Sequence, residues 1–88
     1  MSHESYDVLR EKLKEASRRV PIEFYQHYKK GDIYRVVGFC ILEMTDEVGI
    51  QYIAAEEPAV TWVKPIDDWL QPVIVKGIQI ERFMRTDY

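Results

Sequence analysis

The sequence has one cysteine in 88 residues, so no disulfide can form within the chain. It also lacks any apolar run near the roughly 18 residues that a membrane-spanning helix needs, and its N-terminus is polar and charged, unlike a signal peptide. These absences predict a cytoplasmic protein with no membrane association. The single cysteine, Cys40, lies within an apolar run, which favours a buried structural thiol over a nucleophile.

A basic excess is absent as well. The chain has 12 Lys and Arg residues against 15 Asp and Glu, a formal net charge of -3. Surfaces that bind nucleic acids usually carry a basic excess, so the composition argues against a nucleic-acid partner. The charge is unevenly placed, because residues 41–88 hold 4 of the basic and 9 of the acidic side chains.

Familiar catalytic and metal-binding motifs are missing too. The sequence has no P-loop, no G-x-G-x-x-G and no G-x-S-x-G, and its His and Cys residues do not have the spacing of zinc ligands. The acidic pairs Glu56-Glu57 and Asp67-Asp68 are adjacent in the sequence, so we interpret them as turn and helix-start residues rather than converging carboxylates. The sequence therefore predicts no metal and no cofactor, and it favours a protein that is not an enzyme.

Residues 5–19 have the spacing of an amphipathic helix. Apolar side chains recur every three or four residues and so share one face: Tyr6, Leu9, Leu13, Ala16 and Val20. Ser5 is the expected N-cap. Pro21 must end the helix, because it has no N–H and disfavours a helical backbone at the residue before it. A helix this short is marginal alone in water, so its apolar face should pack on the rest of the chain.

After Pro21 the period of the apolar residues changes to two, which is typical of strands. We expect strands at residues 24–28, 33–44, 49–55, 59–63 and 80–84, turns at 29–32, 45–47, 56–58 and 76–77, and one helical turn at 66–70. Both sides of the segment 33–44 are mostly apolar, which predicts a strand covered on both faces. Gly38, in the middle of that segment, predicts a bend or a bulge.

About five short antiparallel strands joined by turns are typical of a small barrel or sandwich. We therefore predict a mainly β fold with the N-terminal amphipathic helix packed on it. Residues 1–22 would form the tail and the helix, and residues 23–88 the β domain, together one globular unit.

Three segments carry a resemblance to a known family. Residues 25–36 read Tyr-Gln-His-Tyr-Lys-Lys-Gly-Asp-Ile-Tyr-Arg-Val, residues 51–52 read Gln-Tyr, and residues 82–83 read Arg-Phe. They resemble, in order and spacing, the opening Y-x-H-[YF]-K-G-x-x-Y-x-V, the V-x-Y strand and the closing R-F of domain-of-unknown-function family 1653. The first segment has one extra lysine before its glycine.

Two further features fit the same family. Residues 62–65, Trp-Val-Lys-Pro, are similar to its W-V-R-P, and Trp69 stands where the family tends to have Phe. Lys64 replaces the usual arginine, and a lysine cannot make the bidentate contacts of a guanidinium. The resemblance covers about residues 23–85. It implies that the β domain, residues 23–88, is a small SH3-like barrel or roll, and it implies no established activity.

The first hairpin carries one group of candidate binding residues: Tyr25, His27, Tyr28 and Lys29. His27 could act as a general base, or could bind an anion beside the neighbouring lysines. The alternative, which we favour, is that His27 is a structural histidine that hydrogen-bonds the hairpin.

Trp62, Lys64 and Trp69 form the second group of candidates. Trp62 and Lys64 are two residues apart and share a strand face. An exposed tryptophan beside a cation there could hold a planar or anionic ligand, or a proline-rich peptide. The alternative, which we favour, is that Trp62 is the core tryptophan of a small barrel.

Three functions remain open. The leading hypothesis is a binding or adaptor module that contacts an unknown protein, peptide or small molecule through the first hairpin and the segment from Trp62 to Trp69. The second is a small enzyme or small-molecule binder that uses His27 with Lys64 or Arg35 on an anionic ligand. The third is a structural homodimer that forms through an exposed apolar edge, so the sequence leaves both monomer and homodimer open.

Overall fold

The N-terminal helix α1 runs from Tyr6 to Arg19 in the computed structural model, which describes residues 2–88. Ser5 caps it, because its backbone is extended and its hydroxyl accepts a hydrogen bond from the backbone N–H of Val8 at 3.3 Å. The helix ends before Pro21, and the backbone of Val20 has already left the helical region at φ -132° and ψ 80°. The predicted helix is confirmed.

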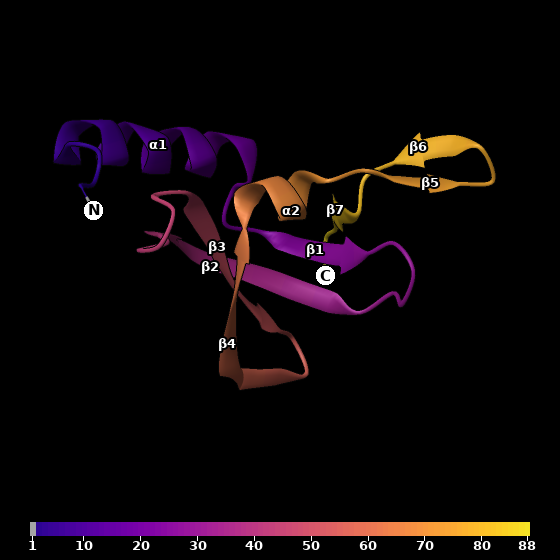
Figure 1. Cartoon of the computed structure of the whole chain (residues 1–88). Coiled ribbons are helices and arrows are strands. Elements are labelled where there is room, and N and C mark those ends of the chain that lie inside the picture. The colour runs from indigo at the N-terminus through magenta and orange to yellow at the C-terminus, as the bar shows by residue number, and fades with distance from the viewer. Residues whose placement is uncertain (1) are drawn as a thin grey trace.

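The apolar face of α1 packs on the sheet as expected, with one exception. Leu9, Ala16 and Val20 are buried, and Leu13 is half-buried. Tyr6, which we expected on this face, is 79% exposed. The reason is that the first turn of α1 projects past the ends of β2 and β3, so no strand lies under it (Figure 1).

Five strands form one antiparallel sheet in the order β4-β3-β2-β1-β7. They are β1 (Phe24–His27), β2 (Ile33–Ile41), β3 (Val48–Ala54), β4 (Glu57–Pro65) and β7 (Phe83–Arg85). The predicted mainly β fold, with five antiparallel strands and an N-terminal helix packed on them, is confirmed. Within residues 2–88 the edge strands β4 and β7 do not pair with each other, so the sheet is open and is not a hydrogen-bonded closed barrel.

The remaining elements connect the two edges of the sheet. The short helix α2 (Ile66–Leu70) follows β4, at the position of the predicted helical turn. β5 (Val73–Val75) then pairs with β6 (Ile78–Ile80) in a separate hairpin, which projects from the rest of the molecule (Figure 1). Lys76 and Gly77 form its turn with φ values of 51° and 79°, so the predicted turn at 76–77 is confirmed.

Some strand boundaries differ from the prediction. Segment 33–44 is a strand only as far as Ile41, because the chain then turns through Asp46, whose φ is 60°. The expected strand 80–84 is two strands, since β6 pairs with β5 whereas β7 crosses to pair with β1. β4 begins at Glu57, inside the expected turn 56–58.

A bulge in β2 decides which of its residues face the core. Val36 and Gly38 lie opposite consecutive residues of β3, so Val37 is the extra residue and the predicted irregularity near Gly38 is confirmed. Beyond the bulge the alternation is reversed, and Phe39 lies on the same face as Val36. The prediction that both faces of this strand are covered is wrong, because Arg35 and Val37 are exposed.

The core lies on the face of the sheet that α1 and α2 cover. Its buried members come from the strands β1, β2, β3 and β7, from α2, and from the residue that follows α1: Val20, Tyr25, Val36, Ile50, Trp69 and Phe83. Trp69 is 3% exposed, and its ring stacks on Phe83 with centroids 3.9 Å apart and planes 9° apart. Trp69 is therefore the core tryptophan. The interpretation of Trp62 in that role is wrong, because Trp62 is 55% exposed.

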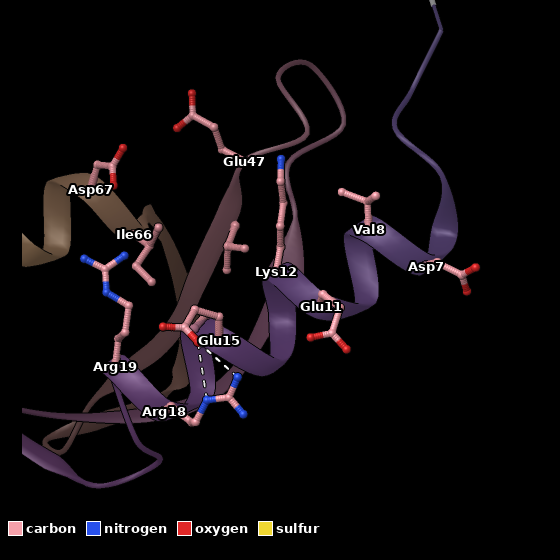
Figure 2. A pocket seen from close by; sticks show the side chains of 12 residues that line it. Asp7, Val8, Glu11, Lys12, Glu15, Arg18, Arg19, Glu47, Ile66 and Asp67 are labelled. Carbon is pink, nitrogen blue, oxygen red and sulfur yellow. Dashed lines mark hydrogen bonds and ion pairs between the residues drawn. The ribbon is translucent and has the colours of Figure 1, made fainter.

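A hollow of about 660 Å³ lies between α1 and the segment that leads into α2 (Figure 2). Its floor is apolar and includes Ala16, Val48 and Ile66. Its rim carries both signs of charge, and Glu15 on that rim is paired with Arg18 at 3.0 Å. The two helices thus cover neighbouring parts of the core face of the sheet and leave this hollow between them.

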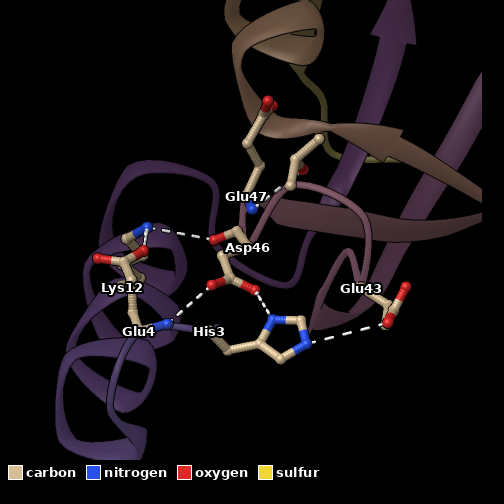
Figure 3. Close-up of polar contacts among 7 residues, drawn as sticks. His3, Glu4, Lys12, Glu43, Asp46 and Glu47 are labelled. Atoms are coloured by element: carbon tan, nitrogen blue, oxygen red, sulfur yellow. Dashed lines mark hydrogen bonds and ion pairs between the residues drawn. The ribbon is translucent and has the colours of Figure 1, made fainter. Parts of the chain in front are cut away.

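The N-terminal tail is fixed to the turn between β2 and β3 by Asp46 (Figure 3). His3 Nδ1 lies 2.5 Å from Asp46 Oδ1, and the backbone N–H of Glu4 donates to Oδ2 at 2.9 Å. Lys12 of α1 pairs with the carboxylate of Glu4 and donates to the backbone oxygen of Asp46 at 3.2 Å. We call these four residues the tail clamp. It ties the tail and the first half of α1 to one end of the sheet.

The two tryptophans should differ sharply in their contribution to stability. We expect Trp69→Ala to lower the free energy of unfolding by about 3–5 kcal/mol, because it leaves a cavity among the stacked rings. Trp62→Ala is the matched control, and it should cost about 1 kcal/mol or less because half of that side chain is already in water. Urea unfolding followed by circular dichroism measures both values. Equal losses in the two variants would contradict the assignment of Trp69 to the core.

The tail clamp should stabilise the fold in a limited pH range. The hydrogen bond and the negative charge of Asp46 raise the pKa of His3, and hydrogen bonds from Glu4 and His3 lower the pKa of Asp46. A raised histidine pKa adds stability below about pH 6.5, which is lost as the pH rises through the raised pKa. A lowered carboxyl pKa adds stability above about pH 4, which is lost as the pH falls through the lowered pKa.

We therefore expect the melting temperature of the wild type to exceed that of His3→Ala by more at about pH 5.5 than at about pH 8.5. Thermal unfolding followed by circular dichroism gives the difference at each pH. Lys14→Ala, on an exposed position of α1, is the control and should shift the melting temperature equally at both pH values. An equal shift for His3→Ala at both pH values would show that the clamp does not titrate.

Candidate binding surface

One face of the sheet gathers most of its aromatic side chains. Residues directly opposite each other in antiparallel strands project to the same face, and so do residues two apart on one strand. By this rule three opposite pairs share the core face: Tyr25 with Tyr34, Tyr52 with Trp62, and His27 with Phe83. Tyr25 and His27 of the first hairpin therefore lie on the same face of the sheet as Trp62, with β2 and β3 between them.

Two of the predicted binding residues lie inside this surface rather than on it. Tyr25 is 4% exposed, and its hydroxyl donates to the backbone oxygen of Pro21 at 2.7 Å. Trp69 is 3% exposed and contacts Tyr25 and Tyr52 edge to face, with centroid distances of 5.4 and 5.2 Å. Both side chains pack under neighbouring rings of the core, and each forms part of the wall of a hollow beside the core.

His27 uses its ring within the first hairpin. Its Nδ1 accepts hydrogen bonds from the backbone N–H groups of Lys29 at 3.2 Å and Lys30 at 3.4 Å. The neutral ring therefore carries its proton on Nε2, where it is a donor and not a base. Burial, and next the positive charge of Arg82, lower the pKa of His27 and favour this neutral form. The geometry fits the structural interpretation of His27.

The other predicted residues are divided between the hairpin and β4. Tyr28 is half-buried, with its ring 4.9 Å from that of His27, and Lys29 is exposed at the turn. Lys64 is half-buried on β4, on the same face as Trp62. Arg35 belongs to the opposite face, where its guanidinium lies 5.7 Å from the centre of the ring of Phe24. The structure does not bring Arg35 together with His27.

The exposed part of the aromatic surface is a hollow beside Trp62. It has a volume of about 420 Å³, and its lining comes from β2, β3 and β4: Tyr34, Tyr52, Ala54, Glu57, Val60 and Trp62. The rings of Tyr34 and Tyr52 stand almost perpendicular, at 85°, with centroids 5.6 Å apart. We call this the aromatic hollow. Its lining can receive an apolar or flat group between rings.

Sequence reasoning missed Tyr34 and Tyr52 as members of this site. Both tyrosines stand in alternating segments, so their strands were predictable, but nothing in the pattern says which strands pair or in which register. Val36 connects them, because it lies opposite Tyr52 and two residues from Tyr34. A tyrosine on each of two long strands is the signal that could have been followed.

Another hollow lies beside the core and is lined by arginines. It has a volume of about 360 Å³, and Arg19, Arg82 and Arg85 stand around it. Arg85 pairs with Glu23 at 3.3 Å, and Arg82 donates from Nε to the backbone oxygen of Gln71 at 3.1 Å. Two of the three guanidinium groups thus already hold the C-terminal segment in place.

Residues 2–88 contain no cluster of His, Cys, Asp and Glu side chains that could hold a metal ion. Neither helix in the same part of the chain is long and apolar enough to cross a membrane. Of the predicted binding residues the aromatic hollow contains Trp62, and the fold places Tyr34 and Tyr52 beside it.

The chain is similar to two known references. The family model described as a protein of unknown function, DUF1653, matches residues 23–85, from just before β1 to the end of β7. A crystal structure of a DUF1653 protein from Bordetella bronchiseptica is 26% identical, with a TM-score of 0.64, and the match covers 78% of this chain and 90% of that one. No curated protein matches the chain. Because the family model spans most of the sequence and the same family supplies the similar structure, the chain belongs to the DUF1653 family.

Proposed function

We propose that the chain is a non-catalytic binding module that holds a peptide segment of a partner protein in the aromatic hollow. The exposure of Trp62 carries the proposal. Tyr25, Trp69 and Phe83 on the same face are 4%, 3% and 8% exposed, whereas Trp62 is 55% exposed on an edge strand. Tryptophan and tyrosine contribute strongly to interfaces because they combine a large apolar area with a polar tip.

The backbone of β4 supports a peptide as the occupant. Within residues 2–88, β4 pairs with β3 on one side only, so the N–H and C=O groups of its outer side can pair with an extended chain. Pro58 and Pro65 have no N–H, which leaves the donors between them. Alternate side chains of a peptide paired in this way would lie on the same face as Trp62.

The family resemblance and the open five-stranded sheet support an SH3-like architecture for this module, and a cytoplasmic location is part of the same proposal. An enzyme that acts on an anionic substrate through His27 is less well supported. The Nδ1 atom of His27 already accepts hydrogen bonds from the hairpin backbone, and Arg35 projects from the opposite face of the sheet.

Selection from a phage-displayed library of random 12-residue peptides on the immobilised wild-type chain tests the proposal. We expect selected peptides to lose at least about tenfold in affinity for Trp62→Ala, the typical effect of removing a central aromatic contact. Tyr6→Ala is the matched control, because Tyr6 is a 79% exposed aromatic residue remote from the hollow, and it should leave the affinity within about twofold.

Circular dichroism establishes that both variants are folded before their affinities are compared. Peptides that bind wild type and Trp62→Ala equally well would place the contact elsewhere and refute the proposed surface. A selection that enriches no peptide would also refute the proposed surface.

A homodimer is the second candidate, and the β5–β6 hairpin favours it. The hairpin projects from the molecule (Figure 1), and its side chains Val75 and Ile78, which lie opposite each other and share a face, are 37% and 65% exposed. Exposed apolar side chains in a contiguous group are typical of protein–protein contacts. Two copies could bury these side chains against each other.

Light scattering over a concentration series tests this second candidate. We expect the mass to double at high concentration for the wild type and to remain that of one chain for Ile78→Asp, because a charge at the contact opposes association. Lys76→Glu, at the turn of the same hairpin, changes charge without removing apolar area and serves as the control. A wild-type mass of one chain at every concentration would end this proposal.

A further inference from the structure

We propose that the aromatic hollow binds a positively charged side chain, an arginine or a lysine, of the peptide. The inference rests on the proposed function and specifies the ligand of the same site. Three aromatic residues and a carboxylate surround the hollow: Tyr34, Tyr52, Trp62 and Glu57.

The rings provide the first part of the argument. The face of an aromatic ring is negative, and a cation within about 6 Å of its centre is attracted to it. Tyr34 and Tyr52 stand at 85° with centroids 5.6 Å apart, so the edge of one ring covers a face of the other, and the exposed ring of Trp62 stands on the adjacent strand. A cation in the hollow would therefore lie beside Trp62, with the two tyrosines in the opposite wall. Tryptophan attracts a cation most strongly of the three aromatic side chains.

The charges around the hollow provide the second part. Glu57 lines the hollow itself, while Asp32 and Glu56 line a separate, smaller hollow of about 260 Å³ at the same end of β2 and β3. Burial raises the pKa of Tyr34, and the negative charges of Asp32 and Glu56 raise it further, so both carboxylates act on the same ring. Within residues 2–88 none of these three carboxylates is in an ion pair.

The cationic side chain of β4, Lys64, lies outside the hollow, which also favours a positively charged ligand. Lys64 is two residues beyond Trp62, toward α2, and does not line the hollow. An anionic ligand would therefore meet carboxylates and ring faces, both of which repel negative charge, and no positive side chain. A cation would instead meet an environment of complementary sign.

Two peptides of the same length test the proposal directly. One alternates arginine with threonine over 12 residues, and the other replaces each arginine by citrulline, which has nearly the same shape but no charge. We expect the arginine peptide to bind about tenfold more tightly than the citrulline peptide, in line with the strength of cation–π contacts. NMR titration should show a shift of the indole N–H signal of Trp62 and not of Trp69, which is buried.

Charge removal at the hollow should weaken binding of the arginine peptide selectively. We expect Glu57→Gln to lower the affinity about three- to tenfold. Glu11→Gln is the matched control, since Glu11 is exposed on α1 and, within residues 2–88, has no ion pair, and it should change the affinity by less than about twofold. Trp62→Ala should abolish the preference for arginine over citrulline.

Failure of this inference can be told from failure of the proposed function. Equal affinity of the arginine and citrulline peptides, with both lost in Trp62→Ala, would overturn the cation site and leave the peptide-binding module intact. Equal weakening by Glu57→Gln and Glu11→Gln would also overturn it, because the attraction would then come from the net charge of the chain. Retention of the arginine preference in Trp62→Ala would overturn both proposals at this site.

Discussion

The stacked contact between Trp69 and Phe83 holds the arrangement of this protein together. Trp69 is on α2, directly after the edge strand β4, and Phe83 begins the opposite edge strand β7. Within residues 2–88 these two edge strands do not pair with each other, so side-chain packing and the hydrogen bond from Arg82 to Gln71 connect them across the face of the sheet. Two rings 3.9 Å apart bury a large apolar area, and a five-residue helix has little stability of its own. The position of α2 therefore depends on this contact.

The contact between Trp69 and Phe83 also determines where the tyrosine rings of the aromatic hollow stand. Tyr52 contacts Trp69 from one side and Tyr34 from the other, and Tyr34 in turn meets Phe83 with centroids 6.0 Å apart. Each ring is thus fixed by one closer to the core. Because the half-buried Tyr34 and Tyr52 are held in this way, packing fixes the walls of the aromatic hollow, which lowers the entropic cost of the binding that we propose.

Local chemistry in the sequence predicted the elements well, and it failed where a long-range contact decides the outcome. Ser5 and Pro21 were enough to locate α1, and Lys76-Gly77 was enough to locate a turn, because caps and turns depend on neighbouring residues. Trp62 and Trp69 could not be ranked in the same way. Alternation shows which residues share a strand face, but it does not show which face a helix covers, nor that the helical turn at 66–70 carries the core tryptophan. The bulge at Val37 also limits prediction from the sequence, because it reverses the alternation of side chains along β2.

The length of the covering elements explains why Trp62 stays in water. Two helices pack on the core face, and the tail clamp fixes α1 over the end of the sheet near Asp46. At the other end, β2 begins and β3 ends, and α2 is too short at five residues to reach it. That uncovered end is where Tyr34, Tyr52 and Trp62 meet Glu57. Within residues 2–88 no helix lies over this area, so Trp62 remains 55% exposed on an edge strand, an arrangement typical of surfaces that contact other proteins.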